Sequence, residues 1–271
     1  MKFIREPATD YHAQRENYLT SHSLLDFKRC PQFYRRKTLG VAPDLDSQAY
    51  KIGRACHVLA LEGRERFENE YTVGGPINPK TGEPYGSRTK AFAEWVAKQD
   101  REVLSDDEAL LVEQMAGSVA SHKKACELLQ HGEPELVLRA EYCGLPCQVR
   151  MDWCDGDQHR IADLKTTENL DYFFYRNQSG HVAGDIIKYG YDYQAAFYSA
   201  IYFRVFHEKP EWYWIATEKR EPFRTGMFAW TDTTWAVHCV AEIMHLIQQM
   251  RECAEEDYWP TGYEEVQPVR R

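Results

Sequence analysis

The stretch that decides the fold is residues 148–166, QVRMDWCDGDQHRIADLKT, in which two alternating runs flank Asp155-Gly156-Asp157. An Asp-Gly pair between alternating apolar runs is the sequence signal of a hairpin turn. A similar run precedes this stretch and ends at Cys143-Gly144, which is a second turn signal. We therefore predict a three-stranded meander over residues 135–142, 145–154 and 159–166.

Three charged side chains on these strands are candidates for a catalytic metal site. Asp163 and Lys165 are two residues apart, so on a strand they share a face while Leu164 points into the core. Asp152, on the neighbouring strand, can lie beside Asp163. Two close carboxylates repel one another unless a cation joins them, and such oxygen ligands suit Mg²⁺ or Mn²⁺. Because a lysine there can orient a water or neutralise a phosphate, the pattern predicts metal-dependent phosphodiester hydrolysis, and the alternative is an ordinary strand with a surface Asp and Lys.

Periodicity along the rest of the chain predicts helices around this meander. Residues 1–20 are polar and aperiodic, and we expect a loose N-terminal arm. The other expected elements are helices over residues 23–40 with a break at Pro31, 49–62, 88–101, 105–132, 183–207 and 231–257, and strands over 211–218 and 224–230. Together these elements predict one α/β domain over residues 21–271, in which helices flank a central mixed β-sheet.

The composition is that of a soluble globular protein. The chain has 271 residues, 43% of them hydrophobic, and a formal net charge of −9. No apolar run approaches the ~20 residues that span a bilayer, and the first residues lack the apolar segment of a secretory signal, so we expect a cytoplasmic protein without a membrane partner. The net charge argues against strong general affinity for nucleic acid, but it leaves room for a local basic cleft.

Four motifs follow one another along the chain. They are SHSLLDFKRCP at residues 21–31, G-x-x-x-H-x-x-x-L-E at residues 53–62, the Asp152…Asp163-Leu164-Lys165 set, and Q-x-x-x-Y at residues 194–198. Gln194 and Tyr198 are four residues apart, so both lie on one helix face. In this order the motifs resemble the RecE-like exodeoxyribonucleases (exonuclease VIII type), in the RecB-like branch of the PD-(D/E)XK nuclease superfamily. The resemblance implies the PD-(D/E)XK nuclease-like fold.

The resemblance also implies a role for each matching residue. In the family, a helical histidine and two carboxylates bind the metal, the residue between the Asp and the Lys gives its backbone carbonyl, and a Gln and a Tyr position substrate and lysine. The residues that match these roles are His57, Asp152, Asp163, Leu164, the catalytic Lys165, Gln194 and Tyr198. Taken alone, a lone histidine would be a structural residue, and the Gln and Tyr would be a polar helix face packed on the sheet.

The activity that the resemblance implies is Mg²⁺-dependent degradation of double-stranded DNA from its ends, with Mn²⁺ as an alternative metal. Family members work 5′ to 3′ and leave 3′ single-stranded overhangs for recombination by annealing. They form ring-shaped homotetramers and are of prophage type, so a homo-oligomer and a RecT-like single-strand annealing protein are the implied partners. The alternatives are a PD-(D/E)XK endonuclease or single-strand nuclease, and a non-catalytic scaffold that binds DNA ends.

Candidate DNA contacts cluster near the N-terminus. Five basic side chains lie within residues 28–37, with Phe33 and Tyr34 between them, and basic and aromatic side chains together suit a phosphate backbone and an unstacked base. Residues 74–89 are dense in Gly and Pro, which predicts a long loop that gates a cleft or separates strands. The predicted DNA-binding residues are Lys28, Arg29, Arg35, Arg36, Lys37, Arg88 and Lys90.

An iron–sulfur cluster occurs in some RecB-like nucleases, with the cysteine of the C-P element as its first ligand. Cys30 matches that ligand, but only Cys239 and Cys253 follow the Q-x-x-x-Y helix. Because four thiolates normally hold such a cluster, we do not expect one here.

Overall fold

The protein is built around a five-stranded sheet in a computed structural model that describes residues 2–42, 48–176, 180 and 182–266. The strand order is β3-β4-β5-β8-β9, with β5 parallel to β8 and the other pairs antiparallel. The strands are β3 (Glu133–Tyr142), β4 (Leu145–Asp155), β5 (Arg160–Thr167), β8 (Glu211–Glu218) and β9 (Thr225–Ala229). The predicted meander and mixed sheet are confirmed.

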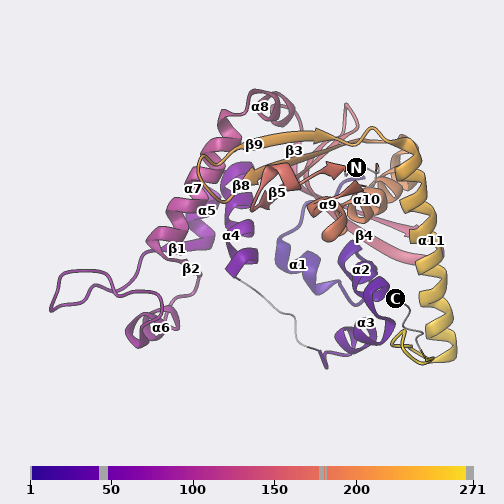
Figure 1. Ribbon diagram of the computed structural model, residues 1–271, viewed down its shortest axis with the longest axis horizontal. Coiled ribbons are helices and arrows are strands. Elements are labelled where there is room, and N and C mark those ends of the chain that lie inside the picture. The colour runs from indigo at the N-terminus through magenta and orange to yellow at the C-terminus, as the bar shows by residue number, and fades with distance from the viewer. Residues whose placement is uncertain (1, 43–47, 177–179, 181, 267–271) are drawn as a thin grey trace.

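Helices cover both faces of this sheet (Figure 1). One apolar layer joins the sheet to α2 (Ser21–Arg29), α10 (Tyr191–Phe206) and α11 (Thr233–Glu256). The other layer contains α4 (Gln48–His57), the π-helical η1 (Val58–Glu62), α5 (Arg64–Glu70), α7 (Asp106–Ser121) and α8 (Lys123–Leu129). The central strands are therefore buried between two helical layers, and polar groups on them are shielded from water.

Local signals account for the helix starts. Ser105 and Glu108 form the expected capping box at α7, and Thr20 caps α2, so this helix begins two residues before the expected Ser23. Pro31 starts α3 (Pro31–Thr38), because proline is tolerated in the first helical turn. Cys30 lies at this break as a half-buried free thiol.

The N-terminal segment is not a loose arm. Residue Ile4 pairs with Val137 on β3, and Leu19 pairs with Cys147 on β4. Between these bridges α1 (Ala8–Ala13) buries Tyr11, whose carbonyl accepts a hydrogen bond from Gln148 Nε2 at 3.1 Å. The prediction failed because backbone pairing to a sheet edge needs no apolar periodicity.

The Gly/Pro-rich loop of residues 74–89 projects away from the sheet in Figure 1. The loop follows β1 (Tyr71–Val73) and leads into α6 (Lys90–Val96). After α6 comes β2 (Glu102–Leu104), which pairs in parallel with β1. Helix α6 is shorter than the expected 88–101. The loop is long, as predicted, whereas its role at a cleft or DNA end stays a prediction.

The helix predicted over residues 183–207 is divided. A short α9 (Asp185–Lys188) precedes α10, and Gly190 between them has a φ of 69°, which ends the helical geometry. The segment before it forms η2 (Leu170–Tyr172) and the paired strands β6 (Tyr175–Arg176) and β7 (Val182–Ala183).

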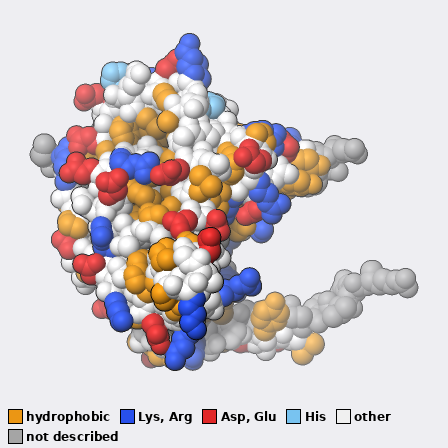
Figure 2. Space-filling model, turned by 90° about the vertical axis from the view of Figure 1, so that its left-hand side faces the viewer, with side chains coloured by type: hydrophobic (Ala, Val, Ile, Leu, Met, Phe, Trp, Pro, Cys, Tyr) orange, Lys and Arg blue, Asp and Glu red, His pale blue; other side chains and the backbone are white. Residues whose placement is uncertain are grey.

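Charged side chains of both signs are interspersed over the face drawn in Figure 2 rather than gathered by sign. This face therefore offers no broad basic patch. Within the described residues, no helix is both long and apolar enough to cross a membrane.

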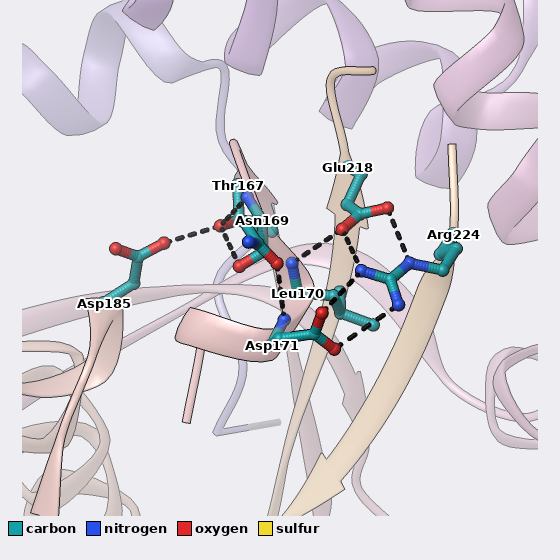
Figure 3. Close-up of polar contacts among 7 residues, drawn as sticks. All are labelled: Thr167, Asn169, Leu170, Asp171, Asp185, Glu218 and Arg224. Carbon is teal, nitrogen blue, oxygen red and sulfur yellow. Dashed lines mark hydrogen bonds and ion pairs between the residues drawn. The ribbon is translucent and has the colours of Figure 1, made fainter. Parts of the chain in front are cut away.

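A polar network fixes the chain where it leaves β5 (Figure 3). Glu218, buried at the end of β8, accepts hydrogen bonds from Arg224 and from the backbone N–H of Leu170 at 2.8 Å. Arg224 also contacts Asp171, and Thr167 Oγ1 donates to Asp185 at 2.6 Å. The network therefore ties β8, β9 and the segment after β5 together.

We expect Glu218→Gln to lower the melting temperature near neutral pH. The hydrogen bonds from Arg224 lower the pKa of Glu218 from its ordinary 4.5 to about 2. A carboxylate with a lowered folded-state pKa stabilises the fold above 4.5, and this contribution is lost as the pH falls toward about 2. Thermal unfolding across this range should show the two proteins converging in acid, and a constant difference would contradict the assignment.

Candidate active site

The site begins where the ladder between β4 and β5 stops. Their last paired residues are Trp153 and Ala162, so the next residues, Asp152 and Asp163, lie where the strands separate. The backbone N–H of Leu164 donates instead to Asp152 Oδ2 at 3.0 Å. A side-chain carboxylate thus replaces a backbone acceptor at this level of the sheet.

The same level is distorted in β3 and β4. Met151 and Cys154 both face the layer of α10 and α11, although residues three apart face opposite sides of a regular strand. Glu135 on β3 lies opposite Asp152, since Pro134 pairs with Trp153 and Leu136 with Met151, and it has a φ of 61°. Such backbone irregularities occur where side chains are turned toward a functional site.

The half-buried Lys165 and the buried Asp163 form an ion pair on β5. Lys165 Nζ lies 2.7 Å from Asp163 Oδ1, and Gln194 Nε2 of α10 donates to the same oxygen at 3.0 Å. Burial raises the pKa of Asp163 above its ordinary value, the Lys165 ammonium opposes this rise, and the nearby Asp152 adds to it. Burial opposes the charge of Lys165, but the Asp163 and Asp152 carboxylates raise its pKa above the ordinary value. Lys165 is therefore a protonated ammonium held in place by Asp163.

His57 lies between two carboxylates. Its Nε2 is 3.3 Å from Asp152 Oδ2 and 3.3 Å from Glu135 Oε1. Burial lowers the pKa of His57, but Asp152 and Glu135 outweigh it and raise the value to about 9. For Asp152, burial is likewise outweighed by the His57 charge, so its pKa lies below the usual range. Burial raises the pKa of Glu135 to about 7, even though Arg150 is ion-paired with it.

These residues fit a divalent cation. One ligand atom each from His57, Glu135 and Asp152 lies within 4.8 Å of the others. Asp163 Oδ2 is buried and accepts no hydrogen bond from the described residues, although Lys165 Nζ lies 2.7 Å away. Carboxylate oxygens with one imidazole form a donor set that Mg²⁺ and Mn²⁺ accept, and a cation would relieve the crowding of negative charge.

Two residues at the site carried no sequence signal. Glu135 belongs to no spacing motif, and only the strand register places it beside Asp152. Tyr191 has its ring centroid 4.9 Å from Lys165 Nζ, three residues before Gln194. A search for further acidic residues in the first strand of the meander could have suggested Glu135.

Tyr198 and Leu164 are the remaining motif residues, and they have different surroundings. Tyr198 is buried, lies edge-on to Trp212 with 5.8 Å between the ring centroids, and hydrogen-bonds to Gln194. It therefore supports Gln194 directly, and its part in positioning substrate stays a prediction. Leu164 buries its side chain in the layer of α4 and α7, as expected, while its carbonyl as a metal ligand stays a prediction.

The predicted DNA-binding cations are partly engaged within the fold. Lys28 lies 3.2 Å from Glu242, Lys37 lies 2.7 Å from Asp26, and Arg35 lies 3.6 Å from Asp257. These acids are paired with three of the five basic side chains within residues 28–37.

The other predicted DNA-binding residues are less engaged by acidic side chains. Arg29 is exposed and lies over the Phe33 ring, and Arg36 is exposed and makes no ion pair within the described part of the chain. Arg88 is exposed, and Lys90 lies 3.5 Å from Glu94 on α6.

Glu135→Gln should weaken both metal binding and activity. The change keeps the side-chain shape and removes one of the charges beside His57, so we expect about a 10–100-fold loss in cation affinity. The cation-induced rise in melting temperature measures this affinity without any activity assay. Glu141→Gln, an exposed residue on the same strand, is the matched control. An unchanged affinity in Glu135→Gln would exclude this residue from the site.

The mixed sheet with Asp152, Asp163 and Lys165 at the divergence of two strands defines a PD-(D/E)XK nuclease-like domain. The chain belongs to the family described as "PDDEXK-like domain of unknown function (DUF3799)", which matches residues 21–271. A similar solved structure is that of a protein from Eubacterium rectale whose name assigns it provisionally as an exonuclease. The two share 14% identity with a TM-score of 0.68, over 99% of this chain and 96% of that one. No curated protein matches the chain.

Proposed function

We propose that the protein is a Mg²⁺-dependent exonuclease that hydrolyses double-stranded DNA from its ends. The observation that carries this proposal is the convergence of Lys165, Asp163, Asp152 and His57, from β5, β4 and α4, in one partly buried cluster. Family membership and the fold support a nuclease, and the order of the four sequence motifs favours an exonuclease of the RecE type.

The proposed chemistry assigns each group a task. His57, Asp152, Asp163 and Glu135 would hold the metal, with the Leu164 carbonyl as a further ligand. A bound divalent cation supplies Lewis acidity toward phosphate and favours ionisation of water. The Lys165 ammonium, fixed by Asp163, orients the attacking water or neutralises charge that develops on the phosphate. Gln194, supported by Tyr198, holds Asp163 and thereby the lysine.

The finer features of this proposal rest on the motif resemblance. They are 5′-to-3′ polarity, release of 3′ overhangs for a RecT-like annealing protein, and a ring-shaped homotetramer. Arg29 and Arg36 are the cations on α2 and α3 that we propose as phosphate contacts, with Arg88 at the projecting loop as a further one. Within a closed ring, DNA would be retained without a strongly basic surface, in keeping with the net charge of −9.

The test compares linear duplex, circular duplex and single-stranded DNA incubated with Mg²⁺, with Mn²⁺ or with EDTA. We expect linear duplex to be degraded faster than single strands and circular duplex to stay intact, with all degradation dependent on metal and absent in Asp163→Ala. Labels at the 5′ or 3′ end report the polarity. Degradation of circular DNA would favour an endonuclease, and degradation of single strands alone a single-strand nuclease. Binding to ends without degradation in either metal would favour a scaffold.

A further inference from the structure

The segment between β5 and α10 exposes aromatic side chains next to the candidate active site. The exposed fractions are 62% for Tyr172, 38% for Phe174, 43% for Tyr175 and 50% for Tyr189. We call these four residues the aromatic ribbon. Exposed aromatic residues gathered in one short segment are unusual on a soluble protein and mark a binding surface.

The ribbon is held firmly. Phe173 is fully buried, with its ring centroid 5.0 Å from that of Phe228, so its neighbours Tyr172 and Phe174 are turned outward. Backbone pairing of Tyr175 with Ala183 joins the two halves of the segment. Gly184 has a φ of 104°, and a Cβ there would lie 2.3 Å from the Tyr172 carbonyl oxygen, so the halves are in direct contact.

The network of Figure 3 fixes the ribbon to the end of the catalytic strand. Thr167, two residues after Lys165, donates to Asp185 at the start of α9, and Arg224 contacts Asp171 in η2. Both halves of the segment are thus tied to β5 or to the β8–β9 pair. This polar network gives a rigid support to side chains that are themselves exposed.

Aromatic rings connect the ribbon to the catalytic lysine. The ring centroids of Tyr189 and Tyr191 are 5.6 Å apart, and the Tyr191 centroid is 4.9 Å from Lys165 Nζ. Lys188 lies over the Tyr189 ring, with Nζ 4.8 Å from its centroid. Tyr191 therefore lies between Lys165 and the exposed Tyr189, so the two are linked through ring contacts.

We propose that the aromatic ribbon binds unpaired bases of the DNA strand whose phosphate lies at Lys165. This inference rests on the proposed function and adds how the substrate is held. Aromatic rings stack on bases irrespective of sequence, and adjacent cations contact the phosphates between them. An exonuclease must separate the terminal nucleotide from its complement, and stacking on the ribbon would offset the cost of unpairing.

The decisive experiment measures binding in EDTA, where the proposed hydrolysis cannot proceed. Fluorescence anisotropy compares the full chain bound to an oligothymidine and to an abasic oligomer of equal length and charge. We expect wild type to prefer the oligothymidine, and Tyr172→Ala/Tyr189→Ala to lose about tenfold in affinity for it while binding the abasic oligomer as before. Tyr172→Phe/Tyr189→Phe keeps the rings and should retain the preference.

Controls separate this inference from its alternatives. Tyr263→Ala removes an exposed aromatic side chain elsewhere and should change nothing. Equal binding of both oligomers by wild type, or an unchanged preference in the double Ala variant, would overturn the proposal. If that variant alters the oligomeric state measured by light scattering without altering base preference, the ribbon contacts protein. A base preference in a protein that never cleaves DNA would refute the proposed function alone.

Discussion

Lys165→Met is expected to lower the single-turnover rate of duplex DNA cleavage by about a thousandfold, within the range seen when a catalytic proton donor or charge is removed. Lys165 Nζ is partly buried and lies 2.7 Å from Asp163, so the change removes a positive charge that is held at a fixed place in the site. Methionine keeps an unbranched side chain of similar length but carries no charge. Binding of DNA ends, followed by anisotropy in EDTA, should change far less than the rate.

Two further variants make this result specific. Lys209→Met removes an exposed lysine and should leave the rate unchanged. Lys165→Arg keeps the charge, but its planar guanidinium cannot reproduce the point contact with Asp163, so we expect little recovery. A Lys165→Met protein that is folded by circular dichroism and cleaves at a rate near that of wild type would refute the assignment of this lysine.

Asp152→Asn should abolish the response to divalent cations and reduce cleavage at least about a hundredfold. Asp152 Oδ2 accepts from Leu164 N–H and faces His57, so an amide at this position loses a metal ligand and can turn a donor toward the cation. For wild type, saturating Mg²⁺ or Mn²⁺ should raise the melting temperature by about 5 °C or more, because ligand binding to the folded state alone stabilises it.

Asp157→Asn is the matched control, since this exposed aspartate lies in the turn between the same two strands. It should keep both the thermal shift and the cleavage rate. Scanning calorimetry with and without each metal gives the shift independently of activity. A full thermal shift in Asp152→Asn would mean that the cation binds elsewhere on the chain.

Much of the fold could be predicted because its signals are local. The Cys143-Gly144 and Asp155-Gly156 turns delimit the meander that became β3, β4 and β5, and the Ser105–Glu108 capping box starts α7. The shared face of Asp163 and Lys165 follows from strand geometry alone. Errors arose where a single residue interrupts a pattern, as Gly190 does between α9 and α10, or where backbone pairing replaces periodicity, as at Ile4.

The basic stretch of residues 28–37 shows a second reason why prediction from the sequence was incomplete. Its charge density was evident from the sequence, but Lys28 is ion-paired with Glu242 and Arg35 with Asp257, more than two hundred residues away along the chain. No local pattern predicts such partners. The sequence therefore overstated the charge that this surface offers to DNA.

The chemistry of the candidate site follows from the amino-acid sequence, which supplies its carboxylates, its histidine and its lysine and places Asp163 beside Lys165 through strand geometry. The surroundings of these residues depend on the tertiary structure. Glu135 faces Asp152 because strand register and a left-handed backbone bring it there, and Tyr198 is buried because α10 packs on the sheet. Contacts between distant segments depend on how whole helices and strands pack together, and the spacing of motif residues does not predict that packing.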